Sequence, residues 1–229
     1  GGTVNPEPGP VWASYLDEFH RRRAGRTEEV MERLTSDGLT PYAWLLRPVA
    51  GRARRVLDLA CGSGGVTAAL HAEGLHPMVI GLDRSHAELM VARSRHRVPV
   101  VEADGLALPF RDGAFDTIVA SMALMVMTPL PDVLAECARV LRPGGVLCAT
   151  VASPLPLRTS DLWLLGPLTA RLGTPPRFPA GGELTGLRPA LEAAGFDVLE
   201  DGRERFAFTV RTLDDARLLL ETLYFPGTP

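Results

Sequence analysis

The stretch VLDLACGSGGVT, residues 56–67, is an apolar run that ends on a burst of small residues and then turns helical. Glycines that follow a buried strand indicate a tight turn at which the backbone comes close to a ligand or to a neighbouring element. The dinucleotide-binding pattern GxGxxG is not met, because counting from Gly62 places its third glycine on Thr67, and no Lys follows as in a Walker loop. Asp58, just before the loop, carries a charge that would oppose a phosphate. The loop therefore predicts that the backbone comes close to a ligand or a neighbouring element, but it does not predict a phosphate-binding site.

Strand-like and helix-like segments alternate around this loop. Short runs rich in Val, Ile and Leu predict strands at residues 56–59, 78–82, 98–101, 115–121 and 146–151. The stretches between them predict helices at residues 66–73, 87–95 and 132–141. Continuous apolar strands separated by helices are typical of a parallel sheet that is covered on both faces. The sequence therefore predicts an α/β fold, a Rossmann-like doubly wound and mostly parallel sheet with flanking helices.

The residues before the first strand predict a helical segment of their own. We expect residues 1–50 to form an N-terminal helical lid, with one helix from Val11, a second that opens at an N-cap on Thr27 and a third over residues 41–49. Residues 51–229 then form the Rossmann-like domain, and the whole chain makes one structural domain.

The alternation of strands and helices stops after the fifth predicted strand. Residues 153–182 are rich in Pro and Gly and predict an inserted cap. A helix over 183–194, strand-like stretches at 196–201 and 205–210 around Gly202, and a final helix over 212–223 follow.

Composition and charge exclude several classes of partner. A net charge of −3 and a pI of about 6.0 offer no basic surface for nucleic acid or an anionic membrane, so we expect neither as a partner. The cysteines Cys61, Cys137 and Cys148 are odd in number and far apart, which predicts neither a disulfide framework nor a metal site. We therefore expect a reduced, cytoplasmic compartment, and either a monomer or a homodimer.

Two further acids follow the next two predicted strands. Asp83 closes MVIGLD and Asp104 lies in VVEADGLALPF. In a doubly wound sheet the carboxyl ends of the strands line the ligand crevice, so Asp58, Asp83 and Asp104 are expected to face one site. A carboxylate after the second strand suits the two hydroxyls of a ribose, and one after the third suits an exocyclic amine of adenine. A nucleoside that carries a positive centre and no phosphate fits this pattern, and S-adenosyl-L-methionine is such a nucleoside.

Five blocks resemble, in order and spacing, the motifs of class I S-adenosylmethionine-dependent methyltransferases: VLDLACGSG, VIGLD, ADGLALPF, FDTIVAS and RVLRPGGVL. The resemblance covers about residues 56–151 and is greatest to the small-molecule branch that includes ubiquinone/menaquinone and sterol methyltransferases. It implies an enzyme that methylates O, N or C of a small metabolite, with S-adenosyl-L-homocysteine as the product. It also implies a set of cofactor-binding residues, which are Tyr15, Asp58, Ala60, Cys61, Gly62, Gly64, Asp83, Arg84, Ala103, Asp104, Gly105 and Ser121. Ala60 departs from the glycine that the family often has before the cysteine.

The same resemblance implies that the helix before the first strand folds over the cofactor. Tyr15 and His20 are the candidates to reach the methionine end of the cofactor. Methyl transfer needs a general base only when the acceptor arrives protonated. His20 is the catalytic candidate, because His71, His76, His86 and His96 are expected on the surface outside the crevice.

The acceptor side is indicated by a methionine-rich stretch, MALMVMTPLP, after the fourth strand. Met122 and Met125 are either core residues or an adaptable apolar wall, which with Trp163 would suit a polyketide, terpenoid or quinone-like ring. Two alternatives stay open. One is a fold-mate that binds the cofactor without methyl transfer, as a cyclase or a binding protein, and the other is a protein or RNA methyltransferase.

Overall fold

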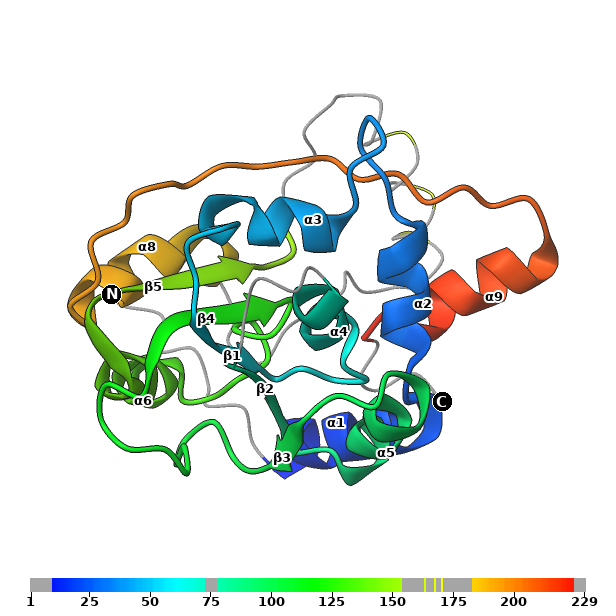
Figure 1. The fold of residues 1–229 in the computed structure, drawn as a ribbon. Coiled ribbons are helices and arrows are strands. Elements are labelled where there is room, and N and C mark those ends of the chain that lie inside the picture. Colours follow the sequence, from blue (N-terminus) through cyan, green and yellow to red (C-terminus); the bar gives the residue numbers. More distant parts are fainter. Residues whose placement is uncertain are drawn as a thin grey trace.

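A central parallel sheet organises the molecule (Figure 1). The computed structural model describes residues 10–72, 78–153 and 183–224, together with Trp163, Pro167 and Ala170. Its strands follow the order β3-β2-β1-β4-β5, and all neighbouring strands are parallel. Their bounds are Arg55–Leu59 (β1), Met78–Asp83 (β2), Val100–Glu102 (β3), Phe115–Ser121 (β4) and Leu141–Thr150 (β5). This order reverses between β1 and β4, and ligands bind beyond the carboxyl ends of strands at such a switch point.

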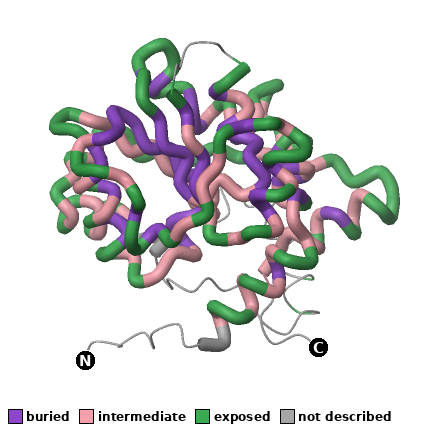
Figure 2. Tube along the Cα trace, turned by 60° about the horizontal axis from the view of Figure 1, so that its bottom comes forward, coloured by how far each residue is buried: buried purple, intermediate pink, exposed green. Residues whose placement is uncertain are grey.

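Helices cover both faces of the sheet, as its apolar strands require. On one face lie α3 (Pro41–Leu46), a 3₁₀ turn (Arg47–Val49) and α4 (Gly65–Ala72), whose Leu45, Leu46 and Leu70 pack against Val56, Val79 and Val119. On the other face, α6 (Leu130–Val140) and α8 (Glu183–Ala193) pack against Leu57, Leu59 and Ile118. The buried residues gather in this layer (Figure 2), and each Leu or Ile buried there contributes about 1.5–3 kcal/mol.

The two ends of the described chain meet beside the sheet. Helices α1 (Pro10–Arg23) and α2 (Arg26–Arg33) precede β1, and α1 packs along α5 (His86–Arg95). Helix α9 (Leu213–Glu221) packs on α2, where Arg33 makes an ion pair with Asp215 at 2.6 Å. Within the described part of the chain, no helix combines the length and the apolar character needed to cross a membrane.

The predicted fold class and the five strands are confirmed, with small shifts at their ends. β5 starts at Leu141 rather than at residue 146, and β3 starts at Val100. One expected helix start was wrong: Gly25, with φ of +79°, precedes α2, and Thr27 lies inside the helix. The reason is that α1 and α2 are joined by so short a turn that a glycine in the left-handed conformation must reverse the chain there.

The two strand-like stretches around Gly202 were also predicted wrongly. Residues 196–211, all of them described, contain no strand, and Ala207 makes an isolated antiparallel bridge with Thr35. This segment instead crosses above α3 on its way from α8 to α9 (Figure 1), where Phe206 packs edge-on against Trp44. Leu199 is 87% exposed, so the alternation of apolar and polar residues in FDVLED does not mark a strand with one buried face. Most of the predicted insertion at 153–182 lies outside the described residues.

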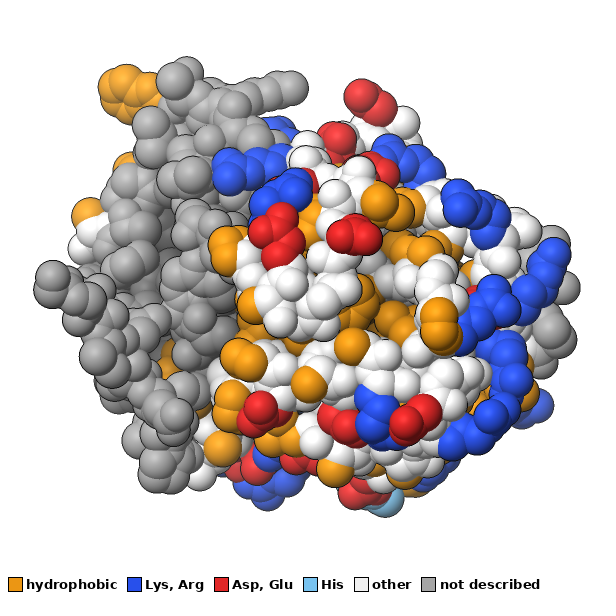
Figure 3. All heavy atoms as spheres, turned by 90° about the vertical axis from the view of Figure 1, so that its left-hand side faces the viewer, with side chains coloured by type: hydrophobic (Ala, Val, Ile, Leu, Met, Phe, Trp, Pro, Cys, Tyr) orange, Lys and Arg blue, Asp and Glu red, His pale blue; other side chains and the backbone are white. Residues whose placement is uncertain are grey.

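The surface at the side of α6 and α8 carries charges of both signs (Figure 3). Acidic and basic side chains both occur there, with hydrophobic side chains between them. This face is therefore not the uniformly basic surface that binding to a phosphate backbone requires.

Candidate active site

A cavity of about 750 Å³ opens at the carboxyl ends of the strands. Its walls come from the loop after β1, the ends of β2, β3 and β4, helices α1 and α2, and the residues that follow α9. Most of the residues predicted from the sequence line it, namely His20, Asp58, Ala60, Cys61, Gly62, Asp83, Arg84, Ala103, Asp104, Gly105, Ser121, Met122 and Met125. Residues far apart in the sequence thus share one cavity, as the order of the strands predicts.

Three of the predicted site residues do not line this cavity. Tyr15 packs in an aromatic cluster with Trp12, Phe19 and Tyr224, at ring-centroid distances of 5.8, 6.1 and 6.3 Å. Trp163 is 85% exposed. Gly64 lies in the loop after β1 but does not border the cavity, and a Cβ added to it would meet Ala92 of α5.

The glycines of the loop serve two different purposes. A Cβ on Gly64 would lie 3.0 Å from the Cβ of Ala92 and 3.3 Å from Cγ2 of Val98, so this glycine lets the loop pack against α5. A Cβ on Gly62 would meet nothing within 4 Å, and Gly62 faces the cavity. Gly62 therefore leaves the cavity room for a ligand close to the backbone.

Asp83 is held by backbone amides at the end of β2. Its Oδ2 accepts the N–H of Gly62 and its Oδ1 accepts the N–H of Ser85, both at 2.8 Å. Burial, the largest influence, raises the pKa of Asp83, while the hydrogen bonds from Ser85 and Gly62 act to lower it. A carboxylate oxygen has two lone pairs, so each oxygen keeps one for a ligand hydroxyl.

Asp58 at the end of β1 and the half-buried Cys61 in the loop after it are titratable groups whose pKa values are shifted by their surroundings. Asp58 is 1% exposed and accepts a hydrogen bond from Thr67 Oγ1 at 2.6 Å, and burial raises its pKa from 3.8 to about 7. Burial also raises the pKa of the Cys61 thiol, with a further contribution from the charge of Asp58. Cys61 is therefore a protonated thiol and not a nucleophile at neutral pH.

The residues after β3 form the outer wall. Asp104 is exposed, and its Oδ1 accepts the N–H of Leu106 at 2.9 Å, which fixes the turn. A Cβ on Gly105 would overlap Cε of Met127, so this glycine lets a methionine reach the cavity wall. Arg84 pairs with Asp17 of α1 at 2.7 Å and so links this wall to the N-terminal helices.

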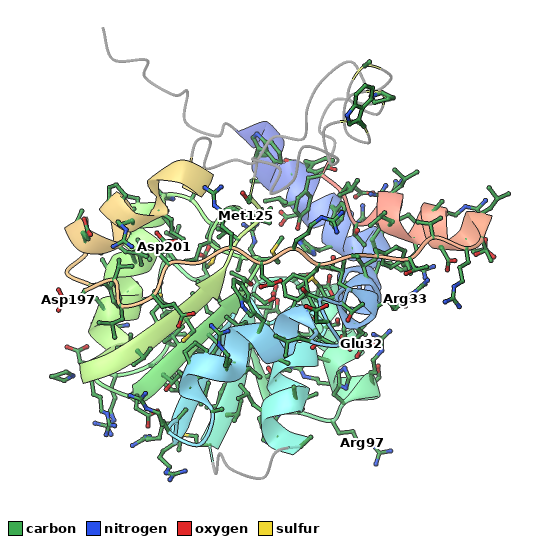
Figure 4. The ribbon with its side chains drawn as sticks, turned by 90° about the horizontal axis from the view of Figure 1, so that it is seen from above. Glu32, Arg33, Arg97, Met125, Asp197 and Asp201 are labelled. Atoms are coloured by element: carbon green, nitrogen blue, oxygen red, sulfur yellow. The ribbon has the colours of Figure 1, made fainter. Side chains whose placement is uncertain are left out.

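The methionines after β4 belong to both the core and the cavity. Met125 is buried, borders the cavity, and its Sδ accepts the N–H of Ala152 at 3.3 Å. Figure 4 shows Met125 centrally, beside the carboxyl ends of the strands, while Arg97, Asp197 and Asp201 lie at the periphery. The two interpretations of the stretch MALMVMTPLP, as part of the core and as a wall of the cavity, are therefore compatible.

Sequence reasoning missed two buried glutamates that border the cavity, Glu28 of α2 and Glu88 of α5. Each lies in the first turn of its helix, where acids are common on exposed surfaces, so the sequence offered no signal that they are buried. Tyr42, Ser63 and Tyr224 also border the cavity unpredicted. His86 was wrongly expected outside the crevice, because it borders the cavity. His96 was expected on the surface but its side chain is only 18% exposed, and its ring Nε2 lies 2.6 Å from Glu28 Oε1.

Comparison with known proteins identifies the central part of the chain. A family model described as a methyltransferase domain matches residues 57–149. Demethylmenaquinone methyltransferase of Clavibacter sepedonicus is 42% identical over 125 residues, which make up 51% of this chain and 49% of that protein. The ubiquinone/menaquinone biosynthesis C-methyltransferase UbiE of Dinoroseobacter shibae is 32% identical over 151 residues, or 63% of this chain and 57% of that protein. The chain thus spans about half the length of the curated relatives it matches.

A solved structure also resembles the chain. The crystal structure of the 4+2 cyclase SpnF has a TM-score of 0.52 and 26% sequence identity, and covers 69% of this chain and 58% of that one. The parallel sheet, the loop after β1 and the acids at the strand ends coincide with the matched range. Residues 57–149 therefore match the methyltransferase-domain family in both sequence and fold.

Proposed function

We propose that the protein is an S-adenosyl-L-methionine-dependent methyltransferase that acts on O, N or C of a small, apolar metabolite. The observation that carries this proposal is the geometry of Asp83. Each of its oxygens accepts one backbone N–H at 2.8 Å and has a second lone pair for another donor, and Asp83 borders the cavity. A carboxylate fixed in this way is suited to accept hydrogen bonds from the two hydroxyls of a ribose.

The cavity residues around Asp83 fit the rest of the cofactor. Ala103, Asp104 and Gly105 would meet the adenine, with Arg84 flanking it. The loop residues Asp58, Ala60, Cys61 and Gly62 would hold the methionine end, and Ser121 would lie beneath the sulfonium. The carboxylates of Asp58 and Asp83 favour a ligand with a positive centre over one with a phosphate.

The cofactor supplies a methyl group made electrophilic by its sulfonium. The chain has to align the acceptor with that methyl group and to exclude water. His20 is the candidate to take a proton from a hydroxyl acceptor, because it borders the cavity and its Nδ1 is held 3.0 Å from Glu88 Oε1.

The acceptor would lie against the apolar wall made by Met122, Met125, Val126 and Met127. Flexible thioether side chains adapt to flat or irregular apolar ligands. The names of the two relatives favour a quinone-like ring among the acceptors that the sequence suggests.

One test examines the cofactor and the role of Asp83 together. Titration calorimetry should show binding of S-adenosyl-L-homocysteine and S-adenosyl-L-methionine but not of NAD. Asp83→Ala should weaken that binding by at least tenfold, since buried ribose hydroxyls would lose their acceptor. Tight binding of NAD, with no response to S-adenosyl-L-homocysteine, would refute the proposal.

A second candidate function has one observation in its favour, which is the similarity to the cyclase SpnF. In that case the cofactor would bind without transferring its methyl group. Incubation with methyl-labelled S-adenosyl-L-methionine and a demethylated, prenylated naphthoquinol separates the two. Label in the quinol supports the methyltransferase, whereas binding with no transfer to this or other apolar hydroxyl or ring acceptors favours the second function.

We also propose a cytoplasmic location and a monomeric or homodimeric state. The three cysteines are free thiols, which supports a reducing compartment. Light scattering coupled to size-exclusion chromatography would give the mass directly, and an assembly larger than a dimer would contradict the proposed oligomeric state.

A further inference from the structure

Glu88 connects the start of α5 to the N-terminal helices, which we call the lid (α1 and α2, residues 10–33). The glutamate is 4% exposed. Its Oε2 accepts the N–H of Gly25, in the turn between α1 and α2, at 2.9 Å. Its Oε1 lies 3.0 Å from Nδ1 of His20 at the end of α1. One buried carboxylate of the sheet domain thus holds both the backbone and a side chain of the lid.

Glu28 makes the reverse connection, from the lid to the sheet domain. It is 3% exposed. Its Oε2 accepts a hydrogen bond from the hydroxyl of Ser63, in the loop after β1. Its Oε1 lies 2.6 Å from Nε2 of His96, and Arg95 Nη1 lies 3.4 Å from its Oε2, both at the end of α5. Glu28 therefore joins the lid to the loop that borders the cavity.

The two contacts lie at opposite ends of the same helix. Glu88 is in the first turn of α5 and His96 directly follows its last residue. Glu88 and His96 are eight positions apart in the sequence, which corresponds to about 12 Å along the helix axis. Two attachments this far apart restrict rotation of the lid as well as its distance from the sheet.

Both contacts also adjoin atoms that the proposed function uses. Gly62 and Ser63 are consecutive in the loop, and Gly62 donates to Asp83. His20 borders the cavity and is the proposed proton acceptor. A movement of the lid would therefore displace groups on both sides of the proposed ribose site.

From this geometry we propose that Glu88 and Glu28 are positioning residues that form a latch, which holds the lid closed over the cofactor part of the cavity and couples it to the loop after β1. The inference rests on the proposed function, because it uses the cofactor product as its probe. Buried carboxylates are suited to this role, since charge-assisted hydrogen bonds are strong and the loss of one partner leaves the other buried and unpaired. The latch predicts that the lid opens before the cofactor leaves.

The test measures the release of S-adenosyl-L-homocysteine by stopped flow and the hydrogen exchange of the lid amides. Glu88→Ala and Glu28→Ala should each release the ligand at least tenfold faster and exchange faster across residues 10–33. Exchange in α6 should stay as in the wild type. Glu88→Gln keeps an acceptor for the Gly25 N–H, so its release rate should fall between those of the wild type and Glu88→Ala.

Two further variants sharpen the assignment. Glu32→Ala is the matched control, because Glu32 lies one turn after Glu28 on α2 but is exposed and does not border the cavity. It should leave the release rate unchanged. Ser63→Ala breaks the contact between Glu28 and the loop but spares His96 and Arg95. It should speed both ligand release and exchange of the lid, but less than Glu28→Ala does, because two of the three partners of Glu28 remain.

Several outcomes would overturn the latch. Wild-type release rates in folded Glu88→Ala and Glu28→Ala, or a Glu32→Ala variant that releases the ligand as fast as Glu28→Ala, would do so. If Glu88→Ala does not fold, Glu88→Gln decides, and wild-type exchange of the lid in that variant contradicts the inference. If the wild type does not bind S-adenosyl-L-homocysteine, the proposed function fails, whereas the exchange of the unliganded lid still tests the latch by itself.

Discussion

Ala60 is the residue at which β1 turns into the loop, and its φ is +55°. A residue with a Cβ pays roughly 1–2 kcal/mol for this left-handed conformation, which glycine adopts freely. Ala60, which stands where the family often has glycine, is thus a strained residue at the edge of the cavity. Backbone strain of this kind collects where a ligand site dictates the path of the chain.

The strain at Ala60 predicts how substitutions there change the stability of the protein. Ala60→Gly should change the free energy of unfolding by less than about 1 kcal/mol, because relief of strain is offset by the greater freedom of glycine in the unfolded chain. Ala60→Val should destabilise the protein by about 2 kcal/mol, since β-branched residues tolerate a positive φ poorly. Urea denaturation measures both, and a Val variant as stable as the wild type would contradict the assignment.

Asp58 is a residue whose burial makes stability depend on pH. Its pKa is raised from 3.8 to about 7, so between these values the folded state keeps a proton that the unfolded state has lost. Stability therefore falls as the pH rises from about 4 to 7 and levels off above that.

Asp58→Asn should remove this dependence. Asn keeps an oxygen that can accept the Thr67 hydroxyl, and it carries no charge to bury. Relative to wild type, the variant should gain about 2.5 kcal/mol of stability between pH 5 and pH 8, because about two units of the pKa shift lie in this pH range. Denaturation at the two pH values tests this, with Asp197→Asn as the control because Asp197 is exposed and lies away from the cavity (Figure 4). A variant with the same pH profile as wild type would show that Asp58 is ionised throughout.

At the scale of elements, the loop between β1 and α4 combines packing and binding in neighbouring glycines. Gly64 allows close contact between the loop and α5, and Gly62 leaves space in the cavity. The sequence pattern treats these glycines alike, because it contains no information about which face of the turn each one presents.

Substitution of the two glycines by alanine should affect different properties, stability at Gly64 and ligand binding at Gly62. Gly64→Ala should cost about 2–3 kcal/mol of stability, because it adds a close contact with Ala92 to a φ of +88°. Gly62→Ala, with φ of +53° and open space around it, should cost about 1 kcal/mol but weaken binding of S-adenosyl-L-homocysteine by more than tenfold. Paired melting and calorimetry measure the two effects, and a larger loss of binding in Gly64→Ala than in Gly62→Ala would reverse the assignment.

At the scale of the whole molecule, the two ends of the described chain meet over one side of the cavity. Tyr224 packs against Phe19 at a ring-centroid distance of 4.6 Å, and Arg23 Nη1 donates to the carbonyl oxygen of Glu221 at 3.1 Å. Tyr224 and Leu223 border the cavity. The segment after α8, which does not join the sheet, is what carries the chain to this place.

Truncation of this contact should loosen the lid without unfolding the core. Tyr224→Ala should increase hydrogen exchange in α1 by about tenfold, since an aromatic pair of this kind contributes about 0.5–1.5 kcal/mol beyond the area it buries. Exchange in β1 and β4 should not change. Leu213→Ala is the control, because Leu213 is 85% exposed. Unchanged exchange in α1 would mean that the end of the chain does not support the lid.

Much of the fold and of the site followed from local sequence. The apolar runs of β1, β2 and β4, the glycine turn and the acids at the strand ends are local signals, and a parallel sheet brings strand ends together whatever the details of packing. The positions of Asp58, Gly62, Asp83, Asp104 and Ser121 around one cavity could therefore be predicted.

Contacts between distant segments could not be predicted in the same way. Glu28 and Glu88 look like ordinary acids at helix starts, and they are buried only because α1 and α2 fold back over α5. FDVLED and RFAFTV have strand-like composition, but a strand needs a partner, and the path of the chain over α3 gives these residues none beyond the bridge at Ala207. By itself the sequence determined the sheet, the loop and the strand ends at which the candidate site lies, because these depend on patterns within a few residues. Only the tertiary structure decided which polar groups are buried and what closes the cavity, because burial depends on which distant segments pack together.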